Sequence, residues 1–267
     1  MPGVARRPIA LITGASAGIG AALAERFAQG GHDLVLVARS TDKLHALAAR
    51  LAKAYGVRSR VEPADLAEPG AASRLAARLK RARCAIDVLV NNAGVLEQGA
   101  FTAITPARHQ QLIDLNVSGL TAMLAAFVPP MVARGQGRVL NVASIAAFQP
   151  VPALATYAAT KAYVLSLSES LAEELRPSGV SVTALCPGIT ATDMLAKAAG
   201  ANDKLRRVPA FVVGRVEDVA EDGYAACMKG TAICVPGLLN RAGTLASRAT
   251  PKWLLRRVSG ALARKAM

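Results

Sequence analysis

The sequence predicts a doubly wound α/β fold, in which a parallel sheet of about seven strands is covered by helices on both faces. Apolar runs of strand length alternate with helical patterns almost from the first residue. These runs lack the apolar–polar alternation of a sheet with one wet face, which indicates strands that are buried on both sides. No low-complexity linker interrupts the pattern before about residue 240. We therefore expect a single domain over residues 1–240 and a distinct tail over residues 241–267.

Helices are expected in the gaps between the strands. Ile19, Leu23 and Phe27 lie at helical spacing in the first gap. Ser40–Thr41 suits the N-cap of the next helix, and the longest helix is expected over about Ala155–Leu175. The expected strands are residues 9–12, 33–38, 60–63, 88–91, 137–142, 180–185 and 232–235.

The cysteine and histidine positions favour a reducing compartment and no metal site. The four cysteines show no CxxC spacing and no neighbouring histidines, and disulfide frameworks belong to small secreted chains. We expect reduced thiols, no metal, and a cytoplasmic protein, since the chain start resembles no signal peptide and no apolar run has the length of a bilayer span. The residues concerned are Cys84, Cys186, Cys227, Cys234, His32, His45 and His109.

The formal net charge of +14 is concentrated in the tail. Nucleic-acid binding is one interpretation of such a balance. The body of the chain lacks aromatic–basic interleaving, zinc-ligand spacing and a nucleic-acid-binding module, so we expect no nucleic-acid partner. The tail carries seven basic residues and no acidic residue: Arg241, Arg248, Lys252, Arg256, Arg257, Arg264 and Lys265.

The tail also shows an amphipathic helical pattern over Pro251–Lys265. Leu254, Leu255, Val258, Ala261 and Leu262 share one helical arc, opposite the basic residues. A basic amphipathic helix can lie on an anionic membrane surface, or it can dock its apolar side on its own or a neighbouring subunit. We favour docking and keep peripheral membrane contact as the alternative.

A glycine-rich turn follows the first strand and opens the first helix, which is the context of a dinucleotide site. Gly14 allows the tight turn, Gly18 allows the backbone to approach a pyrophosphate, and Gly20 allows close packing of helix on sheet. The turn reads Thr13-Gly14-Ala15-Ser16-Ala17-Gly18-Ile19-Gly20, with Ser16 and Ile19 among the expected cofactor contacts. Its GxxxGxG spacing resembles the short-chain dehydrogenase/reductase family, which implies a Rossmann-type fold.

The end of the second strand favours NADP(H) over NAD(H). A carboxylate at this place binds the ribose 2′-hydroxyl of NAD, but this chain has Ala38 followed by Arg39. An arginine binds a 2′-phosphate in bidentate fashion, and Lys43 lies one turn later. The alternative is that Arg39 is an ordinary solvated side chain.

Two further segments are similar to cofactor-binding segments of the family. Asp65 and Leu66 resemble its acid–apolar pair beside the adenine. Asn92, Ala93 and Gly94 belong to an Asn-Asn-Ala-Gly segment that matches the family's NNAG motif, which supports the sheet and passes beneath the cofactor. Asparagine and glycine also favour ordinary turns.

Four side chains match the family's Asn–Ser–Tyr–Lys tetrad. Tyr157 and Lys161 are four residues apart and therefore share one helix face. Ser144 stands thirteen positions before Tyr157, after a strand, and Asn116 lies in a helical stretch. A YxxxK pair alone is weak evidence, but the order and spacing of all four are specific, and the resemblance covers about residues 8–195.

The resemblance implies a role for each member of the tetrad. Tyr157 is expected to give a proton in reduction and to take one in oxidation, although a free tyrosine has a pKa of about 10. Lys161 is expected to stabilise its phenolate and to hold the nicotinamide ribose. Ser144 is expected to bind the substrate oxygen, and Asn116 to position a water that links Lys161 to solvent.

The segment after the sixth strand resembles the family's PG motif. Pro187, Gly188, Ile189 and Thr192 are the expected contacts to the nicotinamide carboxamide and the phosphates. Residues 191–213 interrupt the regular alternation where the family places its substrate lid. The apolar character of this stretch predicts a hydrophobic ketone, aldehyde or alcohol as substrate.

The leading hypothesis is thus an NADP(H)-dependent carbonyl reductase or alcohol dehydrogenase. The alternative is a catalytically silent regulatory or structural relative that binds the cofactor without turnover. The family usually pairs subunits through the helices that hold Asn116 and Tyr157. This implies a homodimer or homotetramer.

Overall fold

The computed structural model contains a seven-stranded, all-parallel sheet, which confirms the predicted fold class. It describes residues 6–192 and 213–251, together with residues 253, 255, 257 and 260. The strand order is β3-β2-β1-β4-β5-β6-β7. The strands are Ile9–Thr13 (β1), Asp33–Ala38 (β2), Ser59–Pro63 (β3), Val88–Asn91 (β4), Gly137–Val142 (β5), Val180–Leu185 (β6) and Ile233–Cys234 (β7).

The strand order reverses beside β1, and this reversal positions the site. Ile12 of β1 pairs with Leu36 of β2 on one side and with Val90 of β4 on the other. The chain passes from β1 to β2 and β3 on one side, and β4 then lies on the other side of β1. The loops that follow β1 and β4 therefore diverge. A crevice at the carboxyl ends of these two strands is where open α/β sheets bind their ligands.

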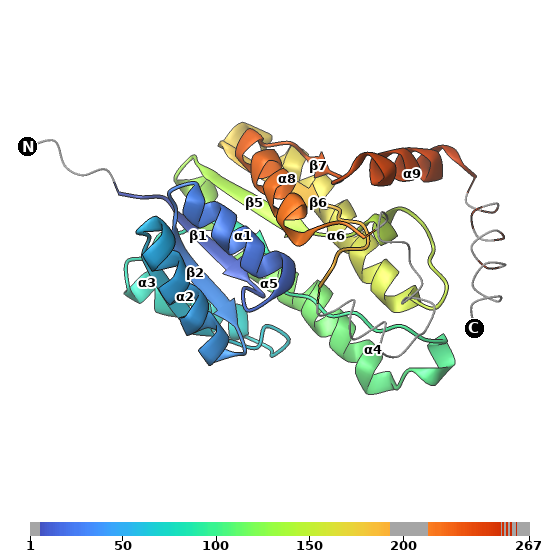
Figure 1. The fold of residues 1–267 in the computed structure, drawn as a ribbon, viewed down its shortest axis with the longest axis horizontal. Helices are drawn as coiled ribbons and strands as arrows, with labels where there is room; N and C mark the ends of the chain where they lie inside the picture. Colours follow the sequence, from blue (N-terminus) through green and yellow to red (C-terminus); the bar gives the residue numbers. More distant parts are fainter. Residues whose placement is uncertain are drawn as a thin grey trace, which may run out of the picture.

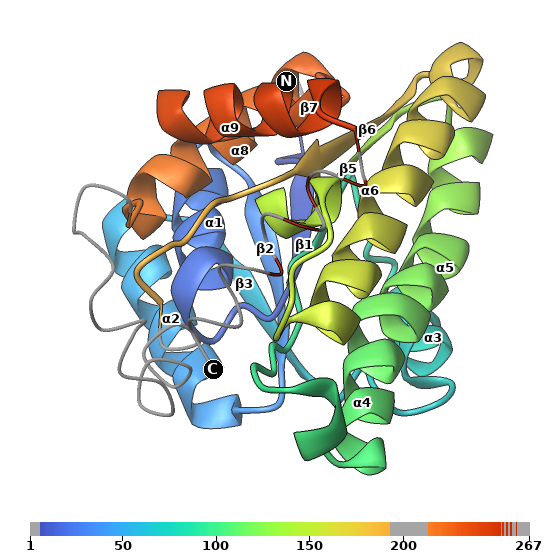
Figure 2. The ribbon, with the colours of Figure 1, turned by 90° about the vertical axis from the view of Figure 1, so that its right-hand side faces the viewer.

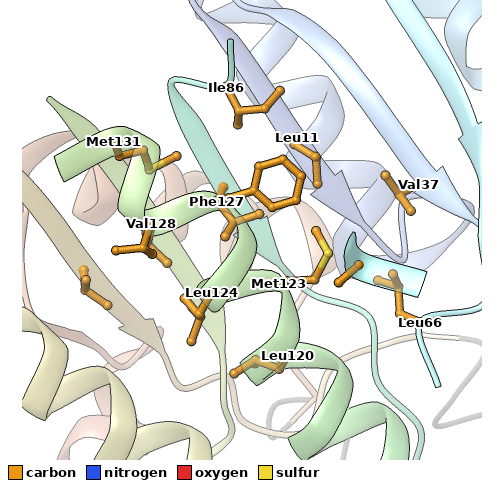
Figure 3. Packing of buried hydrophobic residues seen from close by; sticks show 14 of the residues in the cluster. Leu11, Val37, Leu66, Ile86, Leu120, Met123, Leu124, Phe127, Val128 and Met131 are labelled. Carbon is orange, nitrogen blue, oxygen red and sulfur yellow. The ribbon is translucent and has the colours of Figure 1, made fainter. Parts of the chain in front are cut away.

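Helices cover both faces of the sheet, as Figure 2 shows. On one face, Phe27 of α1 and Leu51 of α2 are fully buried against the sheet. On the other face, Leu75 of α3, Phe127 of α5 and Val164 of α6 fill a second core, part of which is drawn in Figure 3. The helices are Gly18–Gln29 (α1), Thr41–Tyr55 (α2), Ala71–Arg81 (α3), Pro106–Ile113 (α4), Leu120–Ala133 (α5), Ala155–Glu174 (α6), Val216–Lys229 (α8) and Leu238–Ala249 (α9).

The helical run Pro106–Ala133 is long and apolar enough to cross a membrane by length and composition alone. It consists of α4, a π-helical turn over Asp114–Gly119, and α5. Met123 and Met131 of α5 are fully buried and Leu124 is nearly so, in the core shown in Figure 3. The apolar residues of this run thus serve to pack α5 on the sheet.

Four details differ from the sequence expectations or extend beyond them. Ser40 stands at the N-cap of α2, but its side chain makes no capping hydrogen bond. Asn116 lies in a π-helical turn rather than in a regular helix. The helix α9 begins at Leu238, so it crosses the expected tail boundary at residue 240. The expected lid, except its ends, and most of Pro251–Lys265 lie outside the described residues.

Candidate active site

The glycine-rich turn between β1 and α1 is built so that only glycine fits. Gly14 and Gly18 adopt positive φ angles of 65° and 55°. A Cβ atom at Gly14 would lie 2.7 Å from Asn92 Nδ2, and one at Gly20 would lie 2.2 Å from the Gly14 carbonyl oxygen. The α1 N-cap residue, Ala17, offers no side-chain acceptor to the first backbone N–H groups of the helix. This arrangement fits the pyrophosphate of a dinucleotide, since those N–H groups and the positive end of the helix dipole attract an anion.

Thr13 fastens this turn to the segment after β4. Its Oγ1 accepts hydrogen bonds from the backbone N–H groups of Asn92 and Ala93, at 2.9 and 3.0 Å, and donates to the Val90 carbonyl at 3.2 Å. Asn92 Nδ2 donates to the carbonyls of Thr13 and Gly14, at 3.0 and 3.2 Å. The glycine-rich turn and the NNAG segment are therefore held as one unit. Thr13 was not among the predicted site residues, because only the fold brings it beside residues nearly eighty positions away.

Arg39 and Asp65 meet at the carboxyl ends of β2 and β3. The Arg39 Nη1 lies 3.6 Å from Asp65 Oδ2, and about two thirds of the Arg39 side chain is exposed. Asp65 Oδ1 also accepts from the Ala67 N–H at 3.0 Å, which fixes its carboxylate. Leu66 is buried in the core, and its expected contact with the adenine stays a prediction. An exposed guanidinium thus stands at the place expected for the adenosine ribose of the cofactor.

Ser144, Tyr157 and Lys161 come together where β5 meets the start of α6. Burial raises the pKa of Tyr157 above its ordinary value, and the interaction of its side chain with Ser144 offsets part of this rise. Lys161 Nζ donates to the Val142 carbonyl at 2.8 Å and lies 5.8 Å from the centre of the Tyr157 ring. Burial lowers the pKa of Lys161 to about 8. Among the described residues, this buried ammonium has no carboxylate partner. Its positive charge can therefore act on the neighbouring Tyr157.

Asn116 and Lys161 approach each other across Gly94. A Cβ atom at Gly94 would lie 3.2 Å from Asn116 Oδ1 and 3.5 Å from Lys161 Nζ. The Asn116 side chain accepts from the Val95 N–H and donates to the Val95 carbonyl, each at 2.9 Å. Its Nδ2 also donates to Thr160 Oγ1 at 3.1 Å. The π-helical turn, a common feature of functional sites, therefore presents Asn116 to both α6 and the NNAG segment.

The segment after β6 lies opposite the glycine-rich turn. A Cβ atom at Gly18 would lie 3.2 Å from Thr192 Cγ2, so Thr192 stands across from the glycine-rich turn. The Gly214 N–H donates to the Ile189 carbonyl at 2.8 Å, and the Ala191 N–H donates to the Gly214 carbonyl at 3.1 Å. The chain thus leaves for residues 193–212 and returns from them at the crevice. The expected lid over residues 191–213 lies, except for its ends, outside the described residues and stays a prediction.

Pro187 and Gly188 link this segment to neighbouring elements. The Ile145 N–H donates to the Pro187 carbonyl at 3.0 Å, beside Ser144. A Cβ atom at Gly188 would lie 2.5 Å from the side-chain amide of Asn240 in α9. Burial raises the pKa of Cys186 to about 12, so this residue remains a neutral thiol. All four cysteines are free.

Further hydrogen bonds between polar side chains, which were not predicted from the sequence, connect the elements that carry the site. Asn91 Nδ2 donates to Asn141 Oδ1 at 2.9 Å, and Asn141 Nδ2 donates to Ser168 Oγ at 2.9 Å. This chain of bonds joins β4, β5 and α6. His109 Nδ1 is hydrogen-bonded to Thr156 Oγ1 at 2.8 Å, next to Tyr157. In the described part of the chain, no group of three His, Cys, Asp or Glu residues has the arrangement of a metal site, and the expectation of no metal stays a prediction.

Comparison with known proteins identifies the family. Residues 8–203 match the family model of short chain dehydrogenases. The chain belongs to the short-chain dehydrogenase family. Its members are oxidoreductases that bind a nicotinamide cofactor, and the glycine-rich turn of this short-chain dehydrogenase fits such a group.

Several relatives resemble this short-chain dehydrogenase over most of its length. The oxidoreductase UcpA of Escherichia coli is 37% identical over 186 residues, which are 69% of this chain and 70% of the relative. A short-chain dehydrogenase from Sphingobium yanoikuyae, solved in complex with NADPH, is 40% identical with a TM-score of 0.79 and covers 90% of this chain and 92% of its own. The bulky-bulky ketone specific alcohol dehydrogenase of Comamonas testosteroni is 32% identical with a TM-score of 0.76, covering 92% and 95%.

Proposed function

We propose that this short-chain dehydrogenase is an NADP(H)-dependent oxidoreductase that interconverts a hydrophobic ketone or aldehyde and the corresponding alcohol. The observation that carries the proposal is the convergence of Ser144, Tyr157 and Lys161 beside the glycine-rich turn. The bound cofactor would supply or accept the hydride, and the protein would supply orientation and proton transfer.

The tetrad geometry supports a proton path through Tyr157. The side chains of Ser144 and Tyr157 interact, so a carbonyl oxygen placed between their hydroxyl groups would accept a hydrogen bond from both. In reduction Tyr157 Oη would protonate that oxygen, and in oxidation the phenolate would take the proton back. The Lys161 ammonium, held by the Val142 carbonyl, stabilises the phenolate electrostatically. Asn116, which approaches Lys161 across Gly94, would position the water through which Lys161 exchanges protons with solvent.

Arg39 supports the choice of NADP(H). Its guanidinium stands at the end of β2 with most of its surface free, and its partner Asp65 is at the long distance of 3.6 Å. A 2′-phosphate would form shorter, charge-assisted hydrogen bonds with the same guanidinium. The NADPH bound in the Sphingobium yanoikuyae relative agrees with this choice.

Arg39→Ala is expected to weaken NADPH binding about 10- to 100-fold, because hydrogen bonds to a charged phosphate are lost. NADH binding should change little. The measurement is thermal stability of wild type and variant with NADPH, NADP, NADH and NAD. Arg74→Ala is a matched control, because Arg74 is also an exposed arginine paired with an acidic side chain, Glu68. Equal stabilisation of the wild type by all four cofactors would contradict the role of Arg39.

The rate of carbonyl reduction is expected to fall above pH about 8. Lys161 has a pKa of about 8, so its ammonium is present below this pH and is lost above it. Without the ammonium, the phenolate that remains after proton donation by Tyr157 is no longer stabilised. The measurement is kcat/KM for the ketone against pH. Lys229→Met, at an exposed lysine of α8, should leave the profile unchanged, and a profile flat to pH 10 would exclude this role of Lys161.

The surroundings of Ser144 support an apolar substrate. Ser144 is followed by the turn Ile145–Phe148, in which every residue is apolar. Ala147 and Phe148 of this turn are partly buried against the core. The relative from Comamonas testosteroni is a bulky-bulky ketone specific alcohol dehydrogenase. A ketone with large apolar groups is therefore the first substrate class to test.

We also propose a homodimer or homotetramer that pairs through α4, α5 and α6. Ile113, Val132 and Tyr163 are large apolar residues that these helices leave exposed. The mass of the protein in solution tests this proposal. The cytoplasmic location expected from the sequence stays a prediction.

A further inference from the structure

The helix α9 turns its apolar side away from the protein. Leu238, Leu239 and Leu245 are 81, 68 and 68% exposed, whereas Thr244 on the other side is buried. The side facing the body is polar: Asn240 abuts Gly188 and donates from Nδ2 to the Pro236 carbonyl at 2.8 Å. An amphipathic helix on a globular surface normally turns its apolar side to the core and its polar side to solvent. We call Leu238, Leu239 and Leu245 the α9 outer face.

The α9 outer face stands at the periphery of the molecule, where a flat partner can reach it. Figure 1 shows α9 beyond β7, at the opposite end of the molecule from α2. The protein's one tryptophan, Trp253, follows a few residues later and is 54% exposed, with the Arg257 guanidinium 5.9 Å from the centre of its ring. Tryptophan is enriched where an apolar phase meets water, because its ring is apolar and its N–H is polar.

The charge of the surrounding segment identifies the partner. From Arg241 to Met267 the sequence contains seven arginines and lysines and no aspartate or glutamate. A second copy of this chain would bring the same positive charges to the interface, and like charges oppose such pairing. A surface of anionic phospholipid supplies the complementary charge together with an apolar interior for leucine and tryptophan side chains.

We propose that the α9 outer face binds the surface of an anionic phospholipid membrane. The leucines and Trp253 enter the boundary between headgroups and acyl chains, and the net positive charge of the sequence 241–267 attracts the protein to the anionic headgroups. α9 also packs on Gly188 and on the turn Ile145–Phe148, so the membrane contact lies beside the candidate active site. The binding itself does not depend on the proposed reaction.

The test is sedimentation of the full chain with vesicles, read together with the fluorescence of Trp253. Vesicles of phosphatidylcholine mixed with phosphatidylglycerol are compared with vesicles of phosphatidylcholine alone. We expect binding to the anionic vesicles only, a blue shift of the tryptophan emission, and weaker binding at high salt. No sedimentation with either vesicle, or equal binding to both, would overturn the proposal.

Variants of the α9 outer face separate its role from that of charge alone. The triple variant Leu238→Ser/Leu239→Ser/Leu245→Ser is expected to lower the partition coefficient on the order of a hundredfold. Its matched control, Leu238→Ile/Leu239→Ile/Leu245→Ile, keeps the apolar area and should bind like the wild type. Unchanged vesicle binding by the serine variant overturns the proposal. A serine variant that dissociates a lipid-free oligomer also overturns it, because the face would then join two copies of the chain.

Discussion

Tyr157→Phe is expected to lower kcat for carbonyl reduction about 10³-fold while NADPH binding is retained. The substitution removes only the hydroxyl that interacts with Ser144 and that would exchange the proton. The ring keeps its place near Lys161, so the site should stay packed. The measurements are single-turnover oxidation of NADPH by the ketone and the thermal stabilisation by NADPH.

Tyr163→Phe is the matched control for this prediction. Tyr163 lies on the same helix, α6, but its hydroxyl is hydrogen-bonded to Thr121 and its side chain is exposed. Its loss should change kcat by less than about twofold, as for a surface substitution. If Tyr157→Phe keeps wild-type turnover, Tyr157 is not the proton donor and the proposed mechanism fails.

Gly20→Ala is expected to destabilise the protein by about 3 kcal/mol and to abolish stabilisation by the cofactor. The added Cβ would lie 2.2 Å from the Gly14 carbonyl oxygen and 2.4 Å from Asn92 Nδ2. The first of these is backbone, so the glycine-rich turn itself must move. Urea unfolding gives the change in the free energy of unfolding, and thermal shift with NADPH gives the loss of binding.

Gly243→Ala, at another helical glycine, is expected to stabilise the protein. No atom lies within 4 Å of a Cβ atom at Gly243, which is in α9. Alanine loses less backbone entropy than glycine in a helix, so this variant should gain about 0.5–1 kcal/mol. Equal stability of the two variants would show that the close approach at Gly20 does not constrain the turn.

The fold could be predicted from the sequence because its strands are buried on both faces. The run at residues 33–38 contains almost only apolar residues, and the structure places β2 over Asp33–Ala38. Tyr157 and Lys161 could be paired because residues four apart share a helix face whatever the rest of the fold does. The parallel direction of the strands then follows from the helices that connect them.

Contacts between distant residues could not be predicted in the same way. Thr13 meets Asn92, and Asn91 meets Asn141, only after β1, β4 and β5 are adjacent. No local pattern distinguishes these polar residues from those of ordinary turns. The orientation of α9 is a similar case, because amphipathicity shows that a helix has two sides and not which of them docks on the protein.

The most direct test of the central claim is the reaction of the wild-type protein with NADPH and a ketone bearing two bulky apolar groups. NADPH consumption and alcohol formation are measured together, and NADH is the comparison cofactor. The account predicts one alcohol formed for each NADPH oxidised, with NADH much slower, and the reverse reaction with the alcohol and NADP. A protein that NADPH stabilises but that neither reduces ketones or aldehydes nor oxidises alcohols would contradict the account and favour a catalytically silent relative.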